Sequence, residues 1–186
     1  MRTPELFDAI LADLSRALRQ VDASQIEQLQ AAILSADRVF IAGKGRSGLQ
    51  MKAFAMRLMH LGLTVHVLDD VTTPAIAAAD LLLIGSASGR TASLLRHAAT
   101  AQGIGASIAT VTGNLESPIA AAAKTLVHIP ASNFKAGAKS GQDSVLVMGS
   151  LFEHCLGLVC DLLIIRLKHA LGVDESAMNA RHANLE

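Results

Sequence analysis

The chain has 186 residues, which is enough for one ordinary domain with a sizeable core but short for two functional domains. Its 16 basic and 16 acidic residues balance, and it has no Trp, no Tyr and only five Phe. Nucleic acid binding is not expected, because it needs a basic surface and stacking aromatic side chains. An apolar share of 51% with 17% charged residues excludes a disordered chain and suits parallel strands packed between helices.

Two further features indicate a cytoplasmic protein. Cys155 and Cys160 stand five positions apart in one apolar stretch, so they form neither a disulfide framework nor a C-x-x-C pair. Near the amino terminus, Glu5, Asp8 and Asp13 interrupt the apolar residues, which is unlike the basic start and apolar run of a signal peptide. We therefore expect no export.

Two helices are predicted within residues 3–35. Thr3 and Pro4 are typical of a helix start, and apolar residues recur at helical spacing from Leu6 to Leu18. The segment 24–27, of sequence SQIE, reads as the capping box of a second helix.

Strands and helices then alternate. The predicted strands are 38–42, 64–68, 81–84, 106–111 and 125–129, and the predicted helices are 47–61, 91–102 and a short one that begins at Ser117-Pro118. Crossovers between parallel strands are right-handed, and these strands are apolar on both faces. The fold class is therefore α/β, with a doubly wound five-stranded parallel sheet in the flavodoxin-like order 2-1-3-4-5, flanked by helices.

A polar segment, 130–143, precedes a long apolar stretch, 145–170, which is predicted to be a helix. Polar residues such as Glu153 and Asp161 interrupt it too often for a membrane span. The polar tail 174–186 is predicted to be either disordered or folded against a neighbour. We expect one domain, 1–186, in which the helices of 3–35 and the segment 145–186 carry more apolar surface than the sheet can cover and so make subunit contacts.

Two loops are predicted to meet where the strand order reverses. They are 43–48, of sequence GKGRSG, and 86–91, of sequence SASGRT, and each leads from a strand into a helix amino terminus. Glycines admit an anion close to the backbone, and the N–H groups and hydroxyls donate to it, so phosphate is the expected ligand. At least one of Lys44, Arg46 and Arg90 is expected to attract the anion. The alternative is that Gly and Ser merely form tight turns.

The first loop also matches the G-x-G-x-x-G motif of dinucleotide-binding proteins. Asp69 and Asp70 stand at a suitable distance for a ribose-binding acid. This reading ranks second, because the chain has no room for a separate catalytic domain and the reading leaves the loop 86–91 unexplained.

The segment 86–91 fits Ser-x-Ser-Gly-x-Thr, the phosphate-gripping signature of the SIS (sugar isomerase) domain family, and the chain resembles that family. More narrowly, it is similar to the 6-phospho-3-hexuloisomerases, through Gly45–Gly48, Lys52–Gly62, Gly149–Glu153 and Arg181–Glu186. Ala87 and Arg90 stand where these enzymes usually have Gly and Glu, and Lys44 stands where a small residue is common.

The resemblance implies that the chain interconverts a 3-ketohexose 6-phosphate and fructose 6-phosphate through a cis-enediol, after formaldehyde fixation in the ribulose monophosphate pathway. It implies Glu153 and His60 as catalytic residues. It implies that substrate and phosphate are bound by Gly45, Arg46, Ser47, Ser86, Ser88, Gly89, Arg90, Thr91 and His182. It also implies a homotetramer. No redox cofactor is expected, because one group that takes and returns a proton suffices.

The residues themselves leave alternatives open. Glu153 lies in an apolar stretch where desolvation is expected to raise its pKa and suit it to proton transfer, but an ion pair with Arg57 or Arg166 is the competing reading. His60 at a helix end is also suited to stabilising the helix dipole, and His182 lies in what is otherwise an ordinary polar tail. The histidines show no metal-ligand spacing, so no metal is expected.

A further class of function is a regulatory module that senses a phosphosugar. It needs an output domain, for which the sequence shows no segment, and it has no use for a carboxylate beside the sugar.

Overall fold

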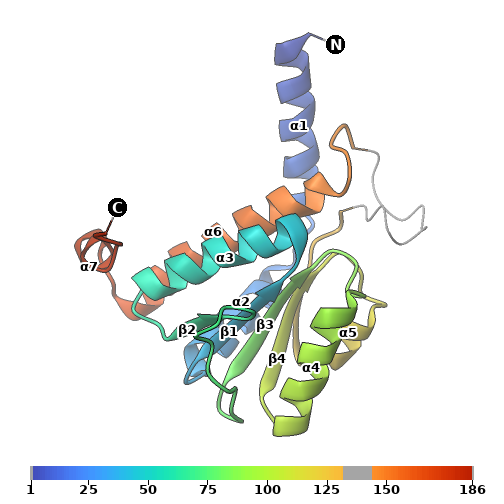
Figure 1. Ribbon diagram of the computed structural model, residues 1–186. Coiled ribbons are helices and arrows are strands. Elements are labelled where there is room, and N and C mark those ends of the chain that lie inside the picture. Colours follow the sequence, from blue (N-terminus) through green and yellow to red (C-terminus); the bar gives the residue numbers. More distant parts are fainter. Residues whose placement is uncertain (1, 132–143, 186) are drawn as a thin grey trace.

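A computed structural model describes residues 2–131 and 144–185 (Figure 1). Its strands are β1 (Val39–Gly43), β2 (Val65–Val67), β3 (Leu81–Ser86), β4 (Ser107–Thr112) and β5 (Thr125–His128). They form one sheet in the order β2-β1-β3-β4-β5, and every neighbouring pair is parallel. The predicted doubly wound α/β sheet is therefore confirmed, including the strand order.

The helices are α1 (Thr3–Leu18), α2 (Ala23–Ser35), α3 (Gly45–His60), α4 (Ala92–Ile104), α5 (Pro118–Ala122), α6 (Ser150–Leu171) and α7 (Glu175–Ala180). None of the helices among the described residues is long and apolar enough to cross a membrane. Of the predicted polar segment 130–143, residues 132–143 lie outside the described residues.

Two boundaries differ from the sequence prediction. The helix expected from 145 begins at Ser150, because Met148 (φ 58°) and Gly149 (φ 82°) are left-handed and do not continue a right-handed helix. The tail is not featureless, since α7 forms there with the Asp174 side chain accepting a hydrogen bond from the Ala177 N–H.

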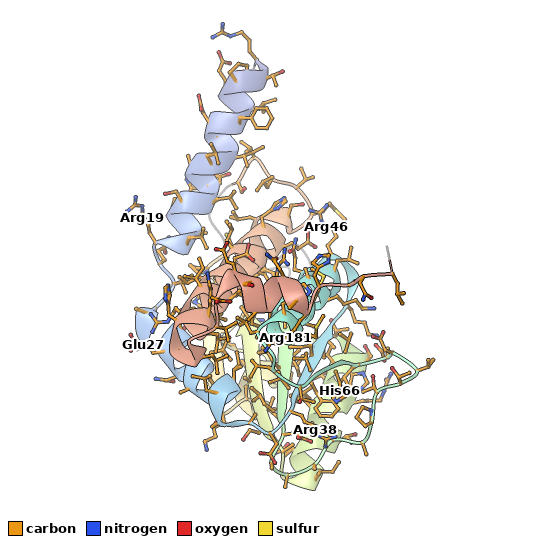
Figure 2. The ribbon with its side chains drawn as sticks, turned by 90° about the vertical axis from the view of Figure 1, so that its left-hand side faces the viewer. Arg19, Glu27, Arg38, Arg46, His66 and Arg181 are labelled. Carbon is orange, nitrogen blue, oxygen red and sulfur yellow. The ribbon has the colours of Figure 1, made fainter. Side chains whose placement is uncertain are left out.

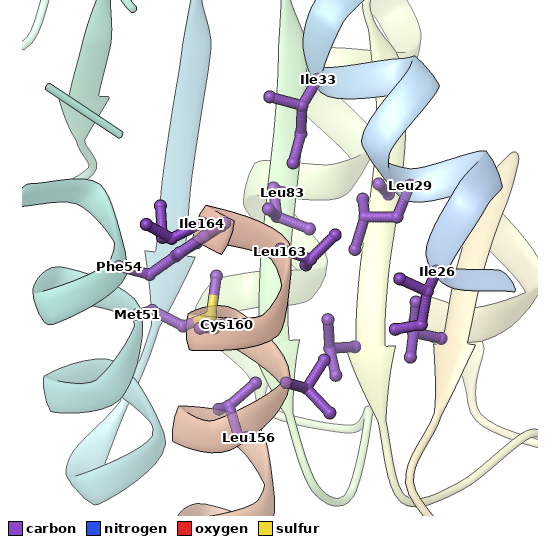
Figure 3. Packing of buried hydrophobic residues seen from close by; sticks show 14 of the residues in the cluster. Ile26, Leu29, Ile33, Met51, Phe54, Leu83, Leu156, Cys160, Leu163 and Ile164 are labelled. Atoms are coloured by element: carbon purple, nitrogen blue, oxygen red, sulfur yellow. The ribbon is translucent and has the colours of Figure 1, made fainter. Parts of the chain in front are cut away.

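Alternating side chains of the strands bury both faces of the sheet. Val39 and Ile41 of β1 point into the core beneath α2, α3 and α6, whereas Phe40 and Ala42 point to α4 and α5 on the opposite face. Figure 3 shows the first of these cores, in which α2, α3 and α6 contribute apolar side chains above Leu83 of β3. Packing on both faces of the sheet therefore holds the helices in place against the strands.

Helix α1 extends away from the body of the molecule (Figure 1). Figure 2 shows its side chains projecting on several sides above the sheet domain. Leu6, Phe7 and Leu11 are 42%, 62% and 62% exposed, whereas Asp13 and Ala17 nearer its end are buried. In the outer half of α1, Leu6, Phe7 and Leu11 therefore form an apolar surface that the described residues do not cover.

Helices α3 and α6 lie side by side and run in the same direction (Figure 1). Their amino termini lie at the carboxyl edge of the sheet, and α7 follows their other end. Because α3 has 16 residues, it is about 24 Å long. Side chains at its two ends therefore belong to two separate regions.

Candidate active site

A cleft of about 330 Å³ opens at the carboxyl edge of the sheet, where β1 and β3 end. Three segments line it. They are the start of α3 with Lys44, Gly45, Arg46 and Ser47, the end of β3 and the following loop with Gly85, Ser86, Ala87, Ser88 and Thr91, and the start of α6 with Met148, Gly149 and Glu153. Leu94 completes the lining. The two loops predicted to meet are thus brought together.

Glycines in the first loop let α3 start directly above the strand end. A Cβ placed on Gly48 would lie 2.8 Å from the carbonyl carbon and oxygen of Gly43, which is closer than such atoms approach. The third glycine of the GKGRSG loop therefore serves helix–strand packing. This close approach brings the first N–H groups of α3 to the cleft.

The second loop is held by its own hydroxyls. Gly89 is left-handed (φ 59°), and a Cβ there would lie 2.0 Å from the Ser117 hydroxyl oxygen. Ser86 Oγ accepts a hydrogen bond from the Gly89 N–H at 3.1 Å, and Ser88 Oγ accepts one from the Arg90 N–H at 3.3 Å. Because these oxygens act as acceptors within the loop, their O–H groups remain free to donate to a ligand.

The helices that begin at the cleft differ in their first turns from α2, α5 and α7, whereas α1, which also lacks a hydrogen bond from its N-cap side chain, begins away from the cleft. Helices α3, α4 and α6 start without a side-chain cap, whereas Asp22, Ser117 and Asp174 cap α2, α5 and α7. An uncapped amino terminus presents N–H donors and the positive end of the helix dipole. Three such termini around one cleft favour an anionic ligand such as a phosphate monoester.

Glu153 is the acidic side chain of the cleft. It lies in the first turn of α6, and its side chain is 14% exposed. Arg46 Nε donates a hydrogen bond to Glu153 Oε2 at 2.5 Å. The partners considered from the sequence are wrong: Arg57 lies beside the His60 ring, and Arg166 donates to the Gln30 side chain. The sequence gives no signal for the true pair, because 107 positions separate its members.

The other two cations of the loops point elsewhere. Lys44 lines the cleft, but its amino group forms an ion pair with Asp69 and holds the pKa of that carboxyl below its usual range. Arg90 donates to the Glu116 carbonyl oxygen at 3.3 Å and is not part of the lining. Asp69, which the dinucleotide reading assigns to a ribose, is thus already held by Lys44.

Sequence reasoning missed the segment 144–149 before α6, of which Met148 and Gly149 line the cleft. Buried Asp13 of α1 anchors it, because Asp13 Oδ2 accepts hydrogen bonds from the Ser144 hydroxyl at 2.7 Å and the Val145 N–H at 2.9 Å. These bonds, the one with Ser144 foremost, lower the pKa of Asp13. Gly149 directly before Ser150 was the available signal for a helix start there.

His60 and His182 do not lie in the cleft. They meet at the far end of α3, where their rings are stacked with centroids 5.2 Å apart. Arg57 and Arg181 complete this histidine corner: Arg57 approaches the His60 ring, and Arg181 donates to the His60 carbonyl oxygen at 3.1 Å. Figure 2 labels one residue of each region: Arg46 of the cleft and Arg181 of the histidine corner.

Burial, followed by the charge of Arg57 and the presence of His182, lowers the pKa of His60. The predicted site residues therefore fall into a cleft group and a corner group at opposite ends of α3, except Gly89 and Arg90, which lie in the second loop but do not line the cleft. Within the described residues, no three His, Cys, Asp or Glu side chains come together in a group that would hold a metal ion.

The cleft lies in a part of the chain that matches a known protein family. The model of the SIS domain family matches residues 32–153, which include both loops and Glu153. The chain belongs to the SIS domain family. The matched range begins within α2 and ends in the first turn of α6. It therefore includes every residue that lines the cleft of this SIS domain.

Two curated relatives match this SIS domain protein over 100% and 90% of its length. It is 40% identical over 186 residues to the 3-hexulose-6-phosphate isomerase of Bacillus subtilis, with 100% of both chains covered. It is 45% identical over 170 residues to the 3-hexulose-6-phosphate isomerase of Mycobacterium gastri, covering 90% of this chain and 83% of that protein. A crystal structure of a Methanococcus jannaschii protein, inferred to be a 3-hexulose-6-phosphate isomerase, matches with a TM-score of 0.84 at 30% identity, covering 98% of this chain and 99% of that one.

Proposed function

We propose that this SIS domain protein interconverts D-arabino-hex-3-ulose 6-phosphate and D-fructose 6-phosphate. The observation that carries this function is a carboxylate, Glu153, placed in a cleft on which three uncapped helix termini converge. The relatives from Bacillus subtilis and Mycobacterium gastri that bear this enzyme name support it over the sensor and the dinucleotide-binding protein.

The phosphate is held by the two loops. Ser86, Ser88 and Thr91 supply hydroxyl donors, and the uncapped starts of α3 and α4 supply N–H groups. Gly45 and Ser47 lie at the start of α3, where their N–H groups face the anion, while Gly89 shapes the second loop. Arg90 contributes positive charge at the rim rather than a direct contact in this geometry.

Glu153 moves the carbon-bound proton. From the 3-ketose, its carboxylate takes the proton of carbon 2, and the electron pair left behind forms the double bond between carbons 2 and 3 of a cis-enediol. Glu153 returns the proton to carbon 3, while the hydroxyl proton on oxygen 2 leaves and oxygen 3 gains one. Atoms and electrons balance without a redox partner, so one positioned acid–base group carries the step.

The direct test is an isomerase assay with purified wild-type protein and Glu153→Gln. The wild type converts the 3-ketose phosphate into fructose 6-phosphate, whereas the variant binds the sugar but turns it over about a thousandfold more slowly. An inactive wild type whose melting temperature rises with phosphosugar contradicts the proposal and supports a sensor. Saturable NADH binding without any response to fructose 6-phosphate supports the dinucleotide reading.

The corner group takes part in the same reaction because the subunits associate and bring it to a neighbouring cleft. The protein forms a homotetramer through the exposed apolar surfaces of α1, α3 and α6. Exposed His182 contacts the sugar in the cleft of a neighbouring subunit, and buried His60, on which its ring is stacked, positions it. This assignment fits their position, because the length of α3 separates them from the cleft of their own chain.

Mixing two variants tests this arrangement. Glu153→Gln and His182→Gln are each expected to be impaired, and mixed oligomers are expected to recover up to about a quarter of wild-type activity at clefts that combine both native residues. A mixture no more active than its components, in tetramers shown to exchange subunits, contradicts a role across the interface.

In the cell, the protein acts in the cytoplasm in the ribulose monophosphate pathway, directly after formaldehyde is fixed. Loss of the protein is then expected to make cells accumulate the 3-ketose phosphate on exposure to formaldehyde. Metabolite measurement in a deletion strain tests this placement.

A further inference from the structure

The base proposed above is not free in the structure. Glu153 Oε2 accepts a hydrogen bond from Arg46 Nε at 2.5 Å. The carboxylate side chain is 14% exposed, whereas that of Arg46 is 59% exposed. A largely buried carboxylate is thus covered at the cleft by a cation that itself faces solvent.

This pairing conflicts with proton abstraction. A general base must bring an oxygen within hydrogen-bond distance of the proton that it removes. Here one oxygen already accepts from a guanidinium that also compensates its charge, so the carboxylate is a poorer acceptor for a carbon-bound proton. Separation of the pair would free this oxygen for the proton of the substrate.

We propose that the phosphate of the substrate separates this pair by taking over Arg46, so that Glu153 becomes an active base only when a phosphorylated sugar occupies the cleft. The inference rests on the isomerase function proposed above. It assigns to Arg46 a positioning role, because Arg46 acts on the reaction through the state of Glu153.

The cleft supplies the means for this exchange. Arg46 lies at the start of α3 in the same cleft as Ser86, Ser88 and Thr91, which are proposed to hold the phosphate. A phosphate dianion carries more charge than a carboxylate and accepts two parallel guanidinium N–H bonds. Arg46 is long and exposed enough to turn from one anion to the other.

The neighbouring cations cannot substitute for Arg46. Lys44 is paired with Asp69, and Arg90 donates to the Glu116 carbonyl oxygen. Among the residues that the structure describes, Arg46 alone is ion-paired with Glu153. The exchange is therefore specific to one residue and can be tested at it.

The first experiment measures whether a free dianion releases the base. Wild-type protein is incubated in heavy water with D-fructose, which lacks the phosphate, and deuterium incorporation at carbon 3 is followed with and without phosphite dianion. We expect phosphite to accelerate incorporation by about tenfold or more, equivalent to about 1.4 kcal/mol. An unchanged or slower rate over a phosphite titration overturns the proposal.

The second experiment uses Arg46→Gln, which leaves Glu153 uncovered. Without phosphite, the variant is expected to exchange carbon 3 of D-fructose several-fold faster than wild type, and phosphite no longer accelerates it. The same variant is expected to lose kcat/KM for fructose 6-phosphate, because the phosphate loses a contact. The matched control is Lys52→Gln, which removes an exposed cation of α3 that pairs with Asp70 rather than Glu153. It is expected to behave as wild type.

Whether the exchange rate of D-fructose rises, stays or falls in Arg46→Gln distinguishes the possible roles of Arg46. If Arg46 only binds phosphate, Arg46→Gln leaves exchange of D-fructose at the wild-type rate; if it only stabilises the reacting sugar, exchange falls. Either result overturns the exchange. Failure of the proposed function is distinguishable, because in that case wild-type protein does not isomerise fructose 6-phosphate at all.

Discussion

The two ends of α3 hold cationic and titratable side chains in opposite settings. At its start, Arg46 faces a carboxylate in a cleft surrounded by uncapped helix termini. At its end, His60 is buried against a second histidine and two arginines, and its pKa is lowered. The first setting is arranged to receive a negative ligand, whereas the second disfavours the charged form of His60 and joins α7 to the body. The same helix therefore borders the proposed active site at one end, and at the other end it holds the C-terminal segment that carries His182.

The largest effect is expected from removing the Glu153 carboxylate, which tests whether the chemistry takes place at the cleft end of α3. Glu153→Gln is expected to lower kcat by about a thousandfold, because general acid–base catalysis of this kind contributes on that scale. The matched control is Glu175→Gln, which removes an exposed carboxylate of α7 that pairs with Lys168 near the histidine corner. It is expected to keep full activity. Comparable losses in both variants would contradict the assignment of chemistry to the cleft end.

A smaller effect is expected from the phosphate loop. Ser88→Ala removes one hydroxyl from the cleft, and hydrogen bonds to charged groups contribute about 1.5–3 kcal/mol, so KM for fructose 6-phosphate is expected to rise at least about tenfold. Steady-state kinetics measure this change. Ser107→Ala, an exposed serine at the start of β4, is the control. An unchanged KM in Ser88→Ala argues against phosphate binding by this loop.

The anchor of the segment 144–149 links α1 to the cleft. Asp13→Asn weakens the bonds to Ser144 and Val145 and is expected to lower the free energy of unfolding by about 1–3 kcal/mol at neutral pH. Because the pKa of Asp13 is lowered in the fold, its contribution is complete above the unfolded pKa and is lost as the pH falls through the folded one. Urea unfolding between neutral and acid pH measures this. A variant with the same acid sensitivity as wild type would contradict the anchor.

The smallest effect concerns the histidine corner. Because the folded pKa of His60 is lowered, the unfolded chain binds its proton first, and stability falls as the pH drops below about 6.5. His60→Gln is expected to reduce this acid-induced decrease in Tm by a few degrees, on the order expected for about 1 kcal/mol. Burial also lowers the pKa of His128, so part of the decrease remains. An undiminished decrease in the variant would show that His60 is not the group that resists protonation.

Sequence patterns predicted the sheet well because each strand is a short apolar run that ends in glycine or polar residues. They failed at the start of α6, where Val145 and Val147 continue the apolar pattern although left-handed Met148 and Gly149 stop the helix. They also failed to foresee α7, whose cap at Asp174 lies in a segment that looked like a polar tail.

The site was predicted unevenly for a physical reason. Both loops follow strands, so the topology alone brings them together. The partner of Glu153, the anchoring of Ser144 by Asp13 and the stacking of His60 on His182 depend on side chains far apart in the sequence. Such pairings are set by tertiary packing, and no local pattern encodes them.

Deuterium incorporation into fructose 6-phosphate tests the central account most directly. In heavy water, the wild-type protein is expected to place the solvent label at carbon 3, and Glu153→Gln is expected to place it there about a thousandfold more slowly. Label at carbon 1 would instead reveal an aldose–ketose isomerase, and label at carbon 3 that appears at the wild-type rate in Glu153→Gln would show that another group removes the proton.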